Sequence, residues 1–177
     1  HKAFVQDLWR RIRERGYLEK GTYEDWYCVG CESFKTEKEL LPGNLCPLHQ
    51  KPAERVKEET YFFRLSHFQT QLLDLYKARP ELIQPATRRN EVISFVESGL
   101  RDLSVSRTSF AWGIPVPDDE AHVMYVWFDA LSNYRSALST PELSRFWAPS
   151  AEVVHLVGKD ILRFHAVYWP AFLLAAG

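Results

Sequence analysis

Cys28-Val29-Gly30-Cys31 is followed, after fourteen intervening residues, by Cys46-Pro47-Leu48-His49, and these two stretches say most about how the chain folds. Each places two potential metal ligands two residues apart, so that both can sit on one tight turn. Three cysteines and one histidine form a four-ligand set that tetrahedral zinc accepts, with no coordination position left open. All 3 cysteines of the chain lie here, so none remains for a disulfide. We therefore predict a structural zinc knuckle within residues 22–61; the alternative is three ordinary thiols beside a surface histidine.

The composition is that of a folded protein. The 177 residues are 46% hydrophobic and 14% aromatic, more than a disordered chain carries. A net charge of -1 creates no general attraction to nucleic acid or to a membrane surface. No apolar run approaches the roughly 20 residues that span a bilayer, and no secretory leader is recognised. Reduced, metal-held cysteines favour a cytoplasmic location. The abrupt ends at His1 and Gly177 indicate an internal piece of a longer protein.

The first half of the chain gives clear local signals. Apolar side chains at helical spacing predict a helix over residues 2–15, which Gly16 would end. Residues 55–65 are rich in aromatic and β-branched side chains, which is typical of a strand or hairpin returning from the knuckle.

Two further helices are expected before the middle of the chain. Ser66 and Gln69 fit a capping box, so we predict a helix from Ser66 to about Ala78. A second helix is predicted over residues 88–98, ending before Gly99.

The last third alternates apolar strands and helices. Val123–Phe128 is expected to form a strand that ends at Asp129, with a helix from there to about Leu138. Glu152–Gly158 is expected to form a second strand, followed by a long apolar helix. Fully apolar strands that alternate with helices predict a parallel sheet covered on both faces, with ligands beyond the carboxyl ends of the strands.

Gly158 and Asp160 are candidate nucleotide-binding residues. Glycine at a strand end permits close approach of a ligand, and an aspartate after it can accept hydrogen bonds from a ribose hydroxyl. The same residues are also common in turns, and the phosphate-loop pattern is absent.

The final helix carries an aromatic stripe, and periodicity alone favours ordinary core packing for it. His165 stands out because a histidine on an apolar face needs a hydrogen-bond partner. Across from it, Tyr134 follows Trp127 on the preceding helix. Together the two faces would form an apolar cavity with a phenol and an imidazole as its polar groups, which suits a thioether side chain.

Read together, these stretches closely resemble the methionyl-tRNA synthetases, class I aminoacyl-tRNA synthetases, of the bacterial type with one zinc knuckle. The resemblance covers essentially the whole chain and is carried by Trp26–Glu32, Lys57–Arg64, Asp102–Arg107, Trp112–Pro117, Tyr125–Leu131 and His155–Ala176. It implies an α/β fold: part of a split Rossmann-type catalytic domain with an inserted α+β connective-peptide domain. Residues 1–120 would be the insertion with its knuckle, and residues 121–177 an incomplete second part of the Rossmann domain.

The resemblance also implies roles for individual residues. Tyr134 and His165 would face the sulfur of methionine, and Gly158 and Asp160 would hold the ribose of ATP and of the adenylate. Arg107 would be a basic residue near the reacting centre. The zinc ligands would be Cys28, Cys31, Cys46 and His49, and the methionine pocket would be formed by Trp127, Ala130, Leu131, Tyr134, Ile161, Phe164, His165 and Trp169. Some relatives carry proline at the Leu131 position.

The implied activity is that of a methionine–tRNA ligase, which activates methionine with ATP and Mg²⁺ and transfers it to tRNA(Met). The His-Ile-Gly-His-type and Lys-Met-Ser-Lys-Ser-type motifs, which stabilise the charge developing on the triphosphate, do not occur in the chain. We therefore predict that the chain alone does not form methionyl-adenylate. The oligomeric state of the parent protein is not predicted.

Two other functions compete with this one. A non-catalytic zinc-binding module for RNA or for protein interactions would share the knuckle, but the basic residues are dispersed and the aromatic residues have core spacing. A class I synthetase for leucine, isoleucine or valine would share the fold, but residues 126–130 and 164–165 match the methionine enzyme better.

Overall fold

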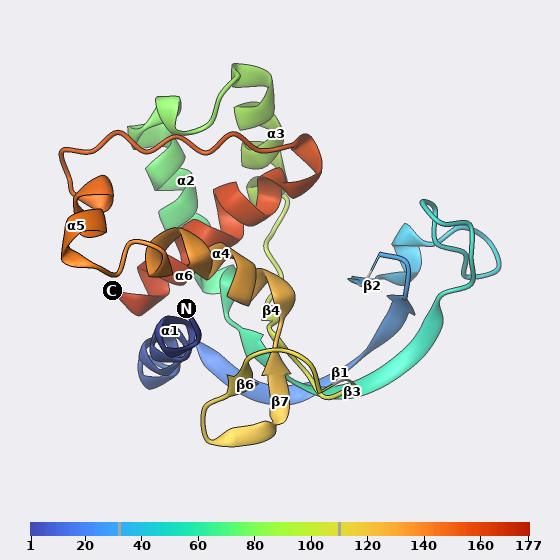
Figure 1. The fold of residues 1–177 in the computed structure, drawn as a ribbon. Coiled ribbons are helices and arrows are strands. Elements are labelled where there is room, and N and C mark those ends of the chain that lie inside the picture. The colour runs from blue at the N-terminus through green and yellow to red at the C-terminus, as the bar shows by residue number, and fades with distance from the viewer. Residues whose placement is uncertain (32, 110) are drawn as a thin grey trace.

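A long, curved β-hairpin extends from a helical body and carries the cysteine and histidine loops at its far end (Figure 1). The computed structural model describes residues 1–31, 33–109 and 111–177, with the side chains of Ser33 and Phe34 left out. The hairpin consists of β1 (Leu18–Cys28) and β3 (Glu54–Phe63), which pair antiparallel from Leu18–Phe63 to Tyr27–Glu54. The predicted strand over 55–65 is confirmed. Two short strands, β2 (Ser33–Lys35) and β4 (Leu103–Ser104), complete a sheet in the order β2-β1-β3-β4.

Helix α1 (Lys2–Glu14) joins the hairpin to the core, as predicted. Its buried face consists of Val5, Leu8, Trp9 and Ile12, at the spacing that the sequence suggested. Gly16 follows with a φ of +78°, the left-handed conformation that glycine adopts without steric cost.

Helices α2 (Gln69–Ala78) and α3 (Ala86–Glu97) pack against each other. The helix predicted over 88–98 is thus confirmed with an earlier start, but the capping box at Ser66 is wrong. A 3₁₀ turn over Leu65–Phe68 precedes α2, and the Ser66 hydroxyl donates to Asp102 Oδ1 at 2.6 Å. Gln69 instead accepts the backbone N–H of Leu100 at 2.9 Å. Long-range partners outcompeted the local cap.

A second sheet replaces the expected parallel one. It contains β5 (Ser106–Arg107), β6 (Pro115–Val116) and β7 (Asp119–Met124) in the order β5-β7-β6, and all pairs are antiparallel. The strand predicted to run to Phe128 stops at Met124, and α4 (Val126–Ser136) begins two residues later. Trp127 and Phe128 therefore lie in the first turn of a helix, not at the end of a strand.

The strand predicted over Glu152–Gly158 is also wrong among the described residues. This segment follows the short helix α5 (Pro141–Ser144) and a 3₁₀ turn over Arg145–Trp147, and it runs as an irregular, extended chain (Figure 1). Leu156 in this segment is 95% exposed. Apolar composition favours a strand, but a strand also needs neighbours for its backbone hydrogen bonds, and none of the described strands pairs with it.

The final helical region, expected as one long apolar helix, is built in three parts. A 3₁₀ turn over Lys159–Ile161 leads to a π-helical turn over Phe164–Tyr168, and then to α6 (Trp169–Ala176). In the π turn the backbone N–H of Trp169 bonds to the carbonyl of Phe164, five residues back.

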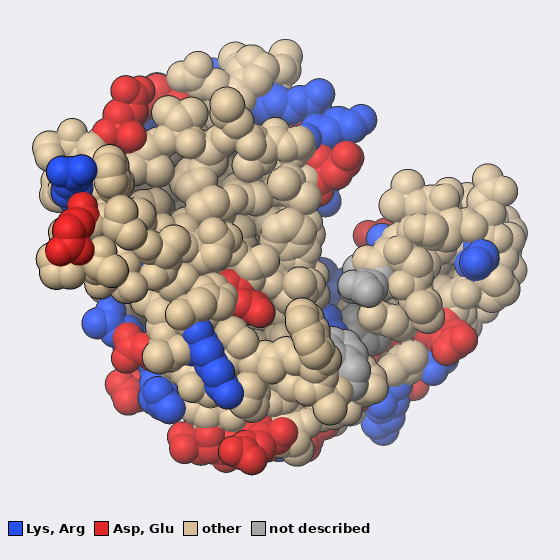
Figure 2. Space-filling model, viewed as in Figure 1, with Lys and Arg blue, Asp and Glu red and all other residues tan. Residues whose placement is uncertain are grey.

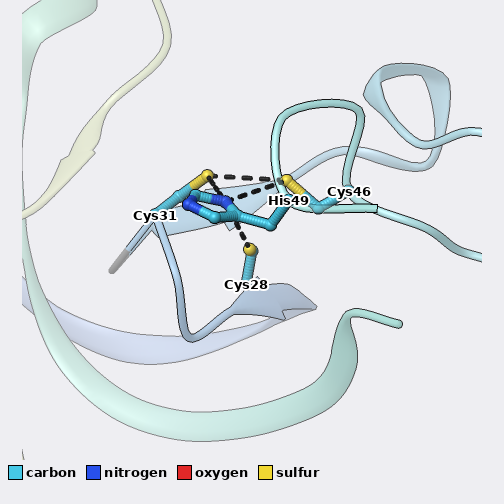
Figure 3. A group of neighbouring side chains, drawn as sticks. All are labelled: Cys28, Cys31, Cys46 and His49. Atoms are coloured by element: carbon cyan, nitrogen blue, oxygen red, sulfur yellow. Dashed lines mark hydrogen bonds between the residues drawn. The ribbon is translucent and has the colours of Figure 1, made fainter. Parts of the chain in front are cut away.

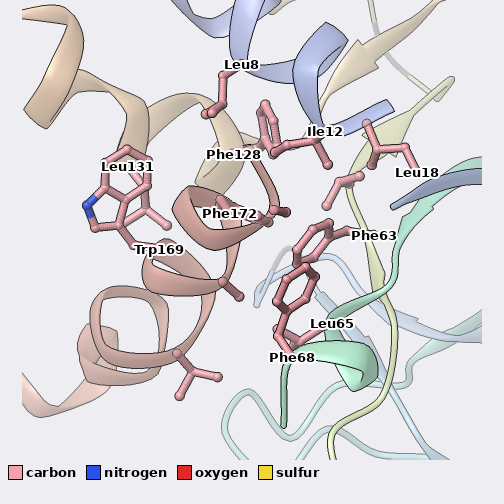
Figure 4. Packing of buried hydrophobic residues seen from close by; sticks show 14 of the residues in the cluster. Leu8, Ile12, Leu18, Phe63, Leu65, Phe68, Phe128, Leu131, Trp169 and Phe172 are labelled. Carbon is pink, nitrogen blue, oxygen red and sulfur yellow. The ribbon is translucent and has the colours of Figure 1, made fainter. Parts of the chain in front are cut away.

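A single hydrophobic cluster unites these elements. Figure 4 shows Phe63 and Phe68 from the hairpin side facing Phe128 and Phe172 from the helical side. The Phe63 and Phe172 rings meet edge to face with centroids 4.9 Å apart. The predicted mixed α/β fold is confirmed; the boundary near residue 120 stays a prediction. None of the described helices has both the length and the apolarity needed to cross a membrane.

Candidate metal centre and aromatic cluster

The predicted knuckle ligands come together at the far end of the hairpin. Cys28 is the last residue of β1, and Cys31 lies in the turn that leads to β2. Cys46 and His49 lie in a tight loop, in which the backbone N–H of Gln50 bonds to the carbonyl of Cys46 at 2.7 Å. Figure 3 shows the three sulfur atoms around one nitrogen of the His49 ring.

The distances among these atoms are those of a metal-ligand tetrahedron. The Nδ1 atom of His49 lies 3.7 Å from Cys28 Sγ, 3.3 Å from Cys31 Sγ and 3.7 Å from Cys46 Sγ. Metal bonds of about 2.3 Å to sulfur and about 2.0 Å to nitrogen require sulfur–nitrogen edges of roughly 3.5 Å. All four ligand atoms lie within 4.8 Å of one another, so this group can hold a metal ion.

Gly30 makes this arrangement possible. A Cβ atom at this position would lie 2.8 Å from atoms of the His49 ring, closer than any side chain can come. The glycine between the two cysteines is therefore needed for the close approach of the histidine, in addition to any role in the turn.

The thiols differ in how readily they lose a proton. Burial and the neighbouring thiols of Cys46 and Cys28 raise the pKa of Cys31 to about 11. Burial also raises the pKa of Cys46, but hydrogen bonds from the backbone and ring of His49 outweigh it and lower that pKa to about 6. Because metal binds the thiolate, binding at neutral pH must release the Cys31 proton.

The second group of candidate residues forms an aromatic cluster between α4 and the π turn. Trp127 stacks on Phe164 with ring centroids 3.9 Å apart and an interplanar angle of 7°. It also meets the His165 ring at 6.2 Å, nearly perpendicular. The two helix faces that the sequence analysis set opposite each other are therefore in direct contact.

The polar pair in this cluster has defined hydrogen bonding. His165 Nδ1 lies 2.8 Å from the carbonyl oxygen of Ile161, which can only accept, so Nδ1 carries a hydrogen. In the neutral ring Nε2 then accepts the hydroxyl hydrogen of Tyr134, at 2.7 Å. The predicted need of His165 for a partner is met twice. The Tyr134 hydroxyl can still accept a hydrogen bond, but its own hydrogen is donated to His165.

The other candidate residues divide into buried and accessible positions. Leu131 and Trp169 are buried in the core, so they support the cluster from behind. Ala130 and Ile161 are half-buried. The stacked rings of Trp127 and Phe164 leave no space between them. An open hollow of about 800 Å³ lies over α3 and Arg163, and none of the candidate methionine residues lines it.

His155 belongs to the cluster, although the sequence gave it no role beyond a strand. Its ring lies 4.3 Å from that of Tyr134 and 6.3 Å from that of His165. Burial, together with the nearby His165, lowers the pKa of His155 below its ordinary value of 6.5. A histidine in an irregular segment has no neighbours at a helical or strand spacing. Its only sequence signal was its place three residues before Gly158, a candidate nucleotide-binding residue.

Gly158 and Asp160 stand at the entrance to the final helical region. Both are exposed, and Asp160 lies in the 3₁₀ turn that leads toward Phe164. A side chain at Gly158 would meet no atom within 4 Å, so the space beside it is open. The structure does not place these residues at the end of a strand.

Arg107 is buried instead of open to solvent. Its guanidinium donates to Ser104 Oγ at 2.6 Å and to the Ser106 carbonyl at 2.7 Å, and it lies over the Tyr125 ring at 4.8 Å. Burial lowers its pKa from the ordinary value. The arginine thus lies at the junction of the two sheets, against the ring of Tyr125, which is the residue directly before α4.

Comparison with known proteins adds independent information. A family model described as tRNA synthetases class I (M) matches residues 1–55 and 39–177. The chain is 52% identical, over all of its length, to a methionine–tRNA ligase of Nostoc, of which it covers 34%. It is 54% identical to that of Rickettsia felis, over 99% of this chain and 34% of the relative.

A solved structure agrees with this match. The crystal structure of Mycobacterium tuberculosis methionyl-tRNA synthetase bound by methionyl-adenylate superimposes with a TM-score of 0.90 and 50% identity, over 100% of this chain and 36% of that one. The chain spans about a third of the length of the curated relatives that it matches.

Proposed function

The chain belongs to the class I tRNA synthetase family (M), and from this membership we propose that it is one part of a methionine–tRNA ligase. The whole protein would join methionine to tRNA(Met) in the cytoplasm, through a methionyl-adenylate made from ATP with Mg²⁺. This part would supply the methionine side-chain pocket, a portion of the nucleotide site and a structural zinc site. Residues 121–177 would belong to the catalytic domain, and residues 1–120 to its connective-peptide insertion.

The observation that carries this proposal is the aromatic cluster of α4 and the π turn. Trp127, Phe164 and the Tyr134–His165 pair lie together, and every ring is held by contacts to its neighbours. Aromatic walls with no charged group suit an apolar side chain, and sulfur interacts favourably with ring edges. Because Trp127 and Phe164 are in contact, methionine would lie beside their stack or would separate the two rings.

The hydrogen-bond directions define what the polar pair can offer to sulfur. A thioether sulfur is a weak acceptor, and the Tyr134 hydrogen is engaged by His165 in this structure. The sulfur would therefore be recognised chiefly through ring contacts. A matched slot distinguishes side chains that differ by one methylene by about 1–3 kcal/mol.

The remaining candidate roles follow from accessibility and chemistry. Gly158 and Asp160 are exposed beside the cluster, where the ribose of ATP would be bound. Arg107 would act from its buried position near the start of α4. The group that binds the methionine ammonium, and the two motifs that stabilise the triphosphate, would lie elsewhere in the whole protein. The chain alone is therefore proposed to be inactive.

The Cys₃His group would hold zinc. Its donor atoms are those that zinc prefers, and four protein ligands leave no position for a substrate. Zinc would therefore stabilise the end of the hairpin without taking part in the reaction.

The non-catalytic module is not favoured. On the face shown in Figure 2, basic and acidic residues are interspersed around the rim, without a single-sign surface for RNA. The aromatic residues of the cluster are engaged with one another, whereas a stacking platform for bases would present its rings to solvent.

Methionine-dependent exchange of pyrophosphate into ATP tests the proposal in the full-length protein. We expect Trp127→Ala to raise the KM for methionine by about tenfold or more, the effect of losing roughly 1.4 kcal/mol or more of binding free energy. The control is Trp112→Ala, because Trp112 is 87% exposed and lies outside the cluster. An unchanged KM and an unchanged preference over leucine in Trp127→Ala and His165→Ala would contradict the pocket.

A further inference from the structure

The segment 103–107 connects the root of the hairpin to α4. By the root we mean the end of β1 and β3 at Leu18 and Phe63, where the hairpin joins the core. Its first part, β4, pairs with β3, and its second part, β5, pairs with β7. Between them the backbone N–H of Val105 bonds to the carbonyl of Tyr61, and the N–H of Tyr125 bonds to the carbonyl of Val105, both at 2.8 Å. One short segment therefore belongs to both sheets, and its middle residue, Val105, is bonded to Tyr125, the residue directly before α4.

His122 of β7 reinforces this junction from inside. The residue is fully buried, and its Nδ1 lies 3.0 Å from the hydroxyl of Ser106, which is also fully buried. The same hydroxyl oxygen accepts the backbone N–H of Tyr61 at 2.8 Å. A side-chain hydrogen bond thus links β7 to β5, and through Ser106 to β3.

The hydrogen-bond partners of His122 indicate which of its ring nitrogens carries a hydrogen. His122 Nε2 lies 3.2 Å from Glu59 Oε1, a carboxylate oxygen that accepts, so Nε2 carries a hydrogen. Nδ1 of the neutral ring then accepts the hydrogen of the Ser106 hydroxyl. Three further groups surround the outer side of the ring: Asp119 at 3.8 Å from Nε2, the Lys20 ammonium that bridges Glu59 and Asp119, and the Tyr61 ring.

The position of His122 gives the link a consequence for the proposed site. Trp127 follows His122 by five residues, and only Tyr125 and Val126 separate Trp127 from the end of β7. A shift of β7 is therefore passed directly to the first turn of α4. Misplacement of a binding group by about 1 Å can cost about a hundredfold in rate.

We propose that His122 is a positioning residue for amino-acid specificity. Its bond to Ser106 fixes β7 against the root of the hairpin, so that α4 presents Trp127 at one place relative to Phe164. The inference rests on the proposed methionine site. It assigns no contact with substrate to His122, whose ring is separated from Trp127 by the end of β7.

Two substitutions of His122 separate its two hydrogen bonds. The amide of asparagine reaches the place of Nδ1, so His122→Asn retains a partner for Ser106 and loses Glu59. The longer glutamine reaches the place of Nε2, so His122→Gln retains Glu59 and loses Ser106. In the full-length protein we expect His122→Gln to raise the methionine KM and to lower the preference for methionine over leucine, each by about tenfold. The KM for ATP should not change, and His122→Asn should stay close to the wild type.

Ser106→Ala provides a second route to the same result, because it removes the partner by deleting one oxygen atom. We expect a rise in methionine KM at least as large, because Ser106→Ala also removes the acceptor of the Tyr61 N–H. The double variant with His122→Gln should show no rise beyond that of Ser106→Ala alone, since the His122–Ser106 bond is already lost. A purely structural role would instead lower the melting temperature while methionine and ATP kinetics remained unchanged, and that result would overturn the inference.

Trp127→Ala distinguishes the failure of this inference from the failure of the proposed function. If Trp127→Ala weakens methionine binding but His122→Gln and Ser106→Ala do not, His122 does not position the pocket. If Trp127→Ala also leaves methionine binding unchanged, the pocket itself is misassigned. Equal effects of His122→Asn and His122→Gln on the methionine KM would overturn the role of the Ser106 bond.

Discussion

The metal knuckle and the aromatic cluster are two sites assembled in opposite ways. The four knuckle ligands come from residues 28–49, within two turns at the end of one hairpin. The cluster draws on α4, the extended segment before the last helix and the π turn, and its rings meet only because the core holds those elements together. One site is defined by spacing along the sequence and can hold a metal ion; the other is defined by packing and depends on the whole fold.

The largest difference is expected on removal of metal. Structural zinc contributes roughly 10–16 kcal/mol to the folding of small zinc peptides, so a strong chelator or Cys31→Ser should unfold the knuckle within residues 22–61. The cluster should remain folded because it rests on the hydrophobic core. Hydrogen exchange of residues 41–53 and 126–136, together with the zinc content, measures both regions. Val29→Ser is the control, since Val29 lies in the same turn and is 67% exposed. Unchanged protection of residues 41–53 from hydrogen exchange after chelation would contradict this prediction.

Gly30→Ala tests the knuckle without removing a ligand. The new methyl group would collide with the His49 ring, so we expect metal affinity to fall by roughly tenfold to a hundredfold, as when a group that orients a ligand is lost. Competition with a chromophoric chelator measures this. Gly158→Ala is the matched control, because a methyl group there meets nothing within 4 Å. Equal metal affinities for Gly30→Ala and Gly158→Ala would show that the His49 ring can move away from the new methyl group.

Tyr134→Phe tests how the cluster is held. It removes the hydrogen that His165 Nε2 accepts but keeps the ring, so we expect a loss of about 1–2 kcal/mol in the free energy of unfolding. The methionine KM should change by no more than a few-fold, because the aromatic walls remain. Urea denaturation measures the first quantity. The control is Tyr17→Phe, whose hydroxyl bonds to none of the described residues. A greater loss for Tyr17→Phe would contradict the importance of the Tyr134–His165 bond.

The smallest effect is expected from His155. Its pKa is lowered in the folded state, so between that pKa and 6.5 the unfolded chain binds more protons, and stability rises with pH. The contribution is present above pH 6.5 and is lost as the pH falls below it. Replacing His155 with phenylalanine should reduce the difference between urea midpoints at pH 7.5 and 5.5. Leu156→Ala is the control, because Leu156 follows His155 in the chain, is 95% exposed and carries no titratable group, so the difference should stay as it is. A larger change for Leu156→Ala than for His155→Phe would refute the assignment.

The same contrast explains what could be predicted from the sequence. Ligand spacing identified all four knuckle residues, and the apolar period of residues 2–15 identified α1, because both signals are local. Ser66 and Gln69 failed as a capping box because their side chains found partners at Asp102 and Leu100, more than thirty residues away. Local patterns cannot reveal such competition.

The residues of the aromatic cluster could be predicted from the sequence, but their geometry could not. Trp127 and His165 do meet, yet Trp127 lies in a helix where a strand was expected, and the strand over Glu152–Gly158 does not form. Apolar runs mark burial or pairing without saying which partner supplies it. His122 was overlooked because its role depends on Ser106, and no sequence period connects the two.

The π-helical turn over Phe164–Tyr168 has a consequence for alignment and engineering. Such a turn accommodates one more residue than a regular α-helix over the same length, and its side chains are displayed accordingly. Deleting a single amino acid from a regular α-helix rotates every later side chain by about 100° relative to the earlier ones. Deleting one from the π turn would instead restore ordinary winding and leave α6 with the same face toward the core. A one-residue gap would therefore do less harm here than inside α1 or α4.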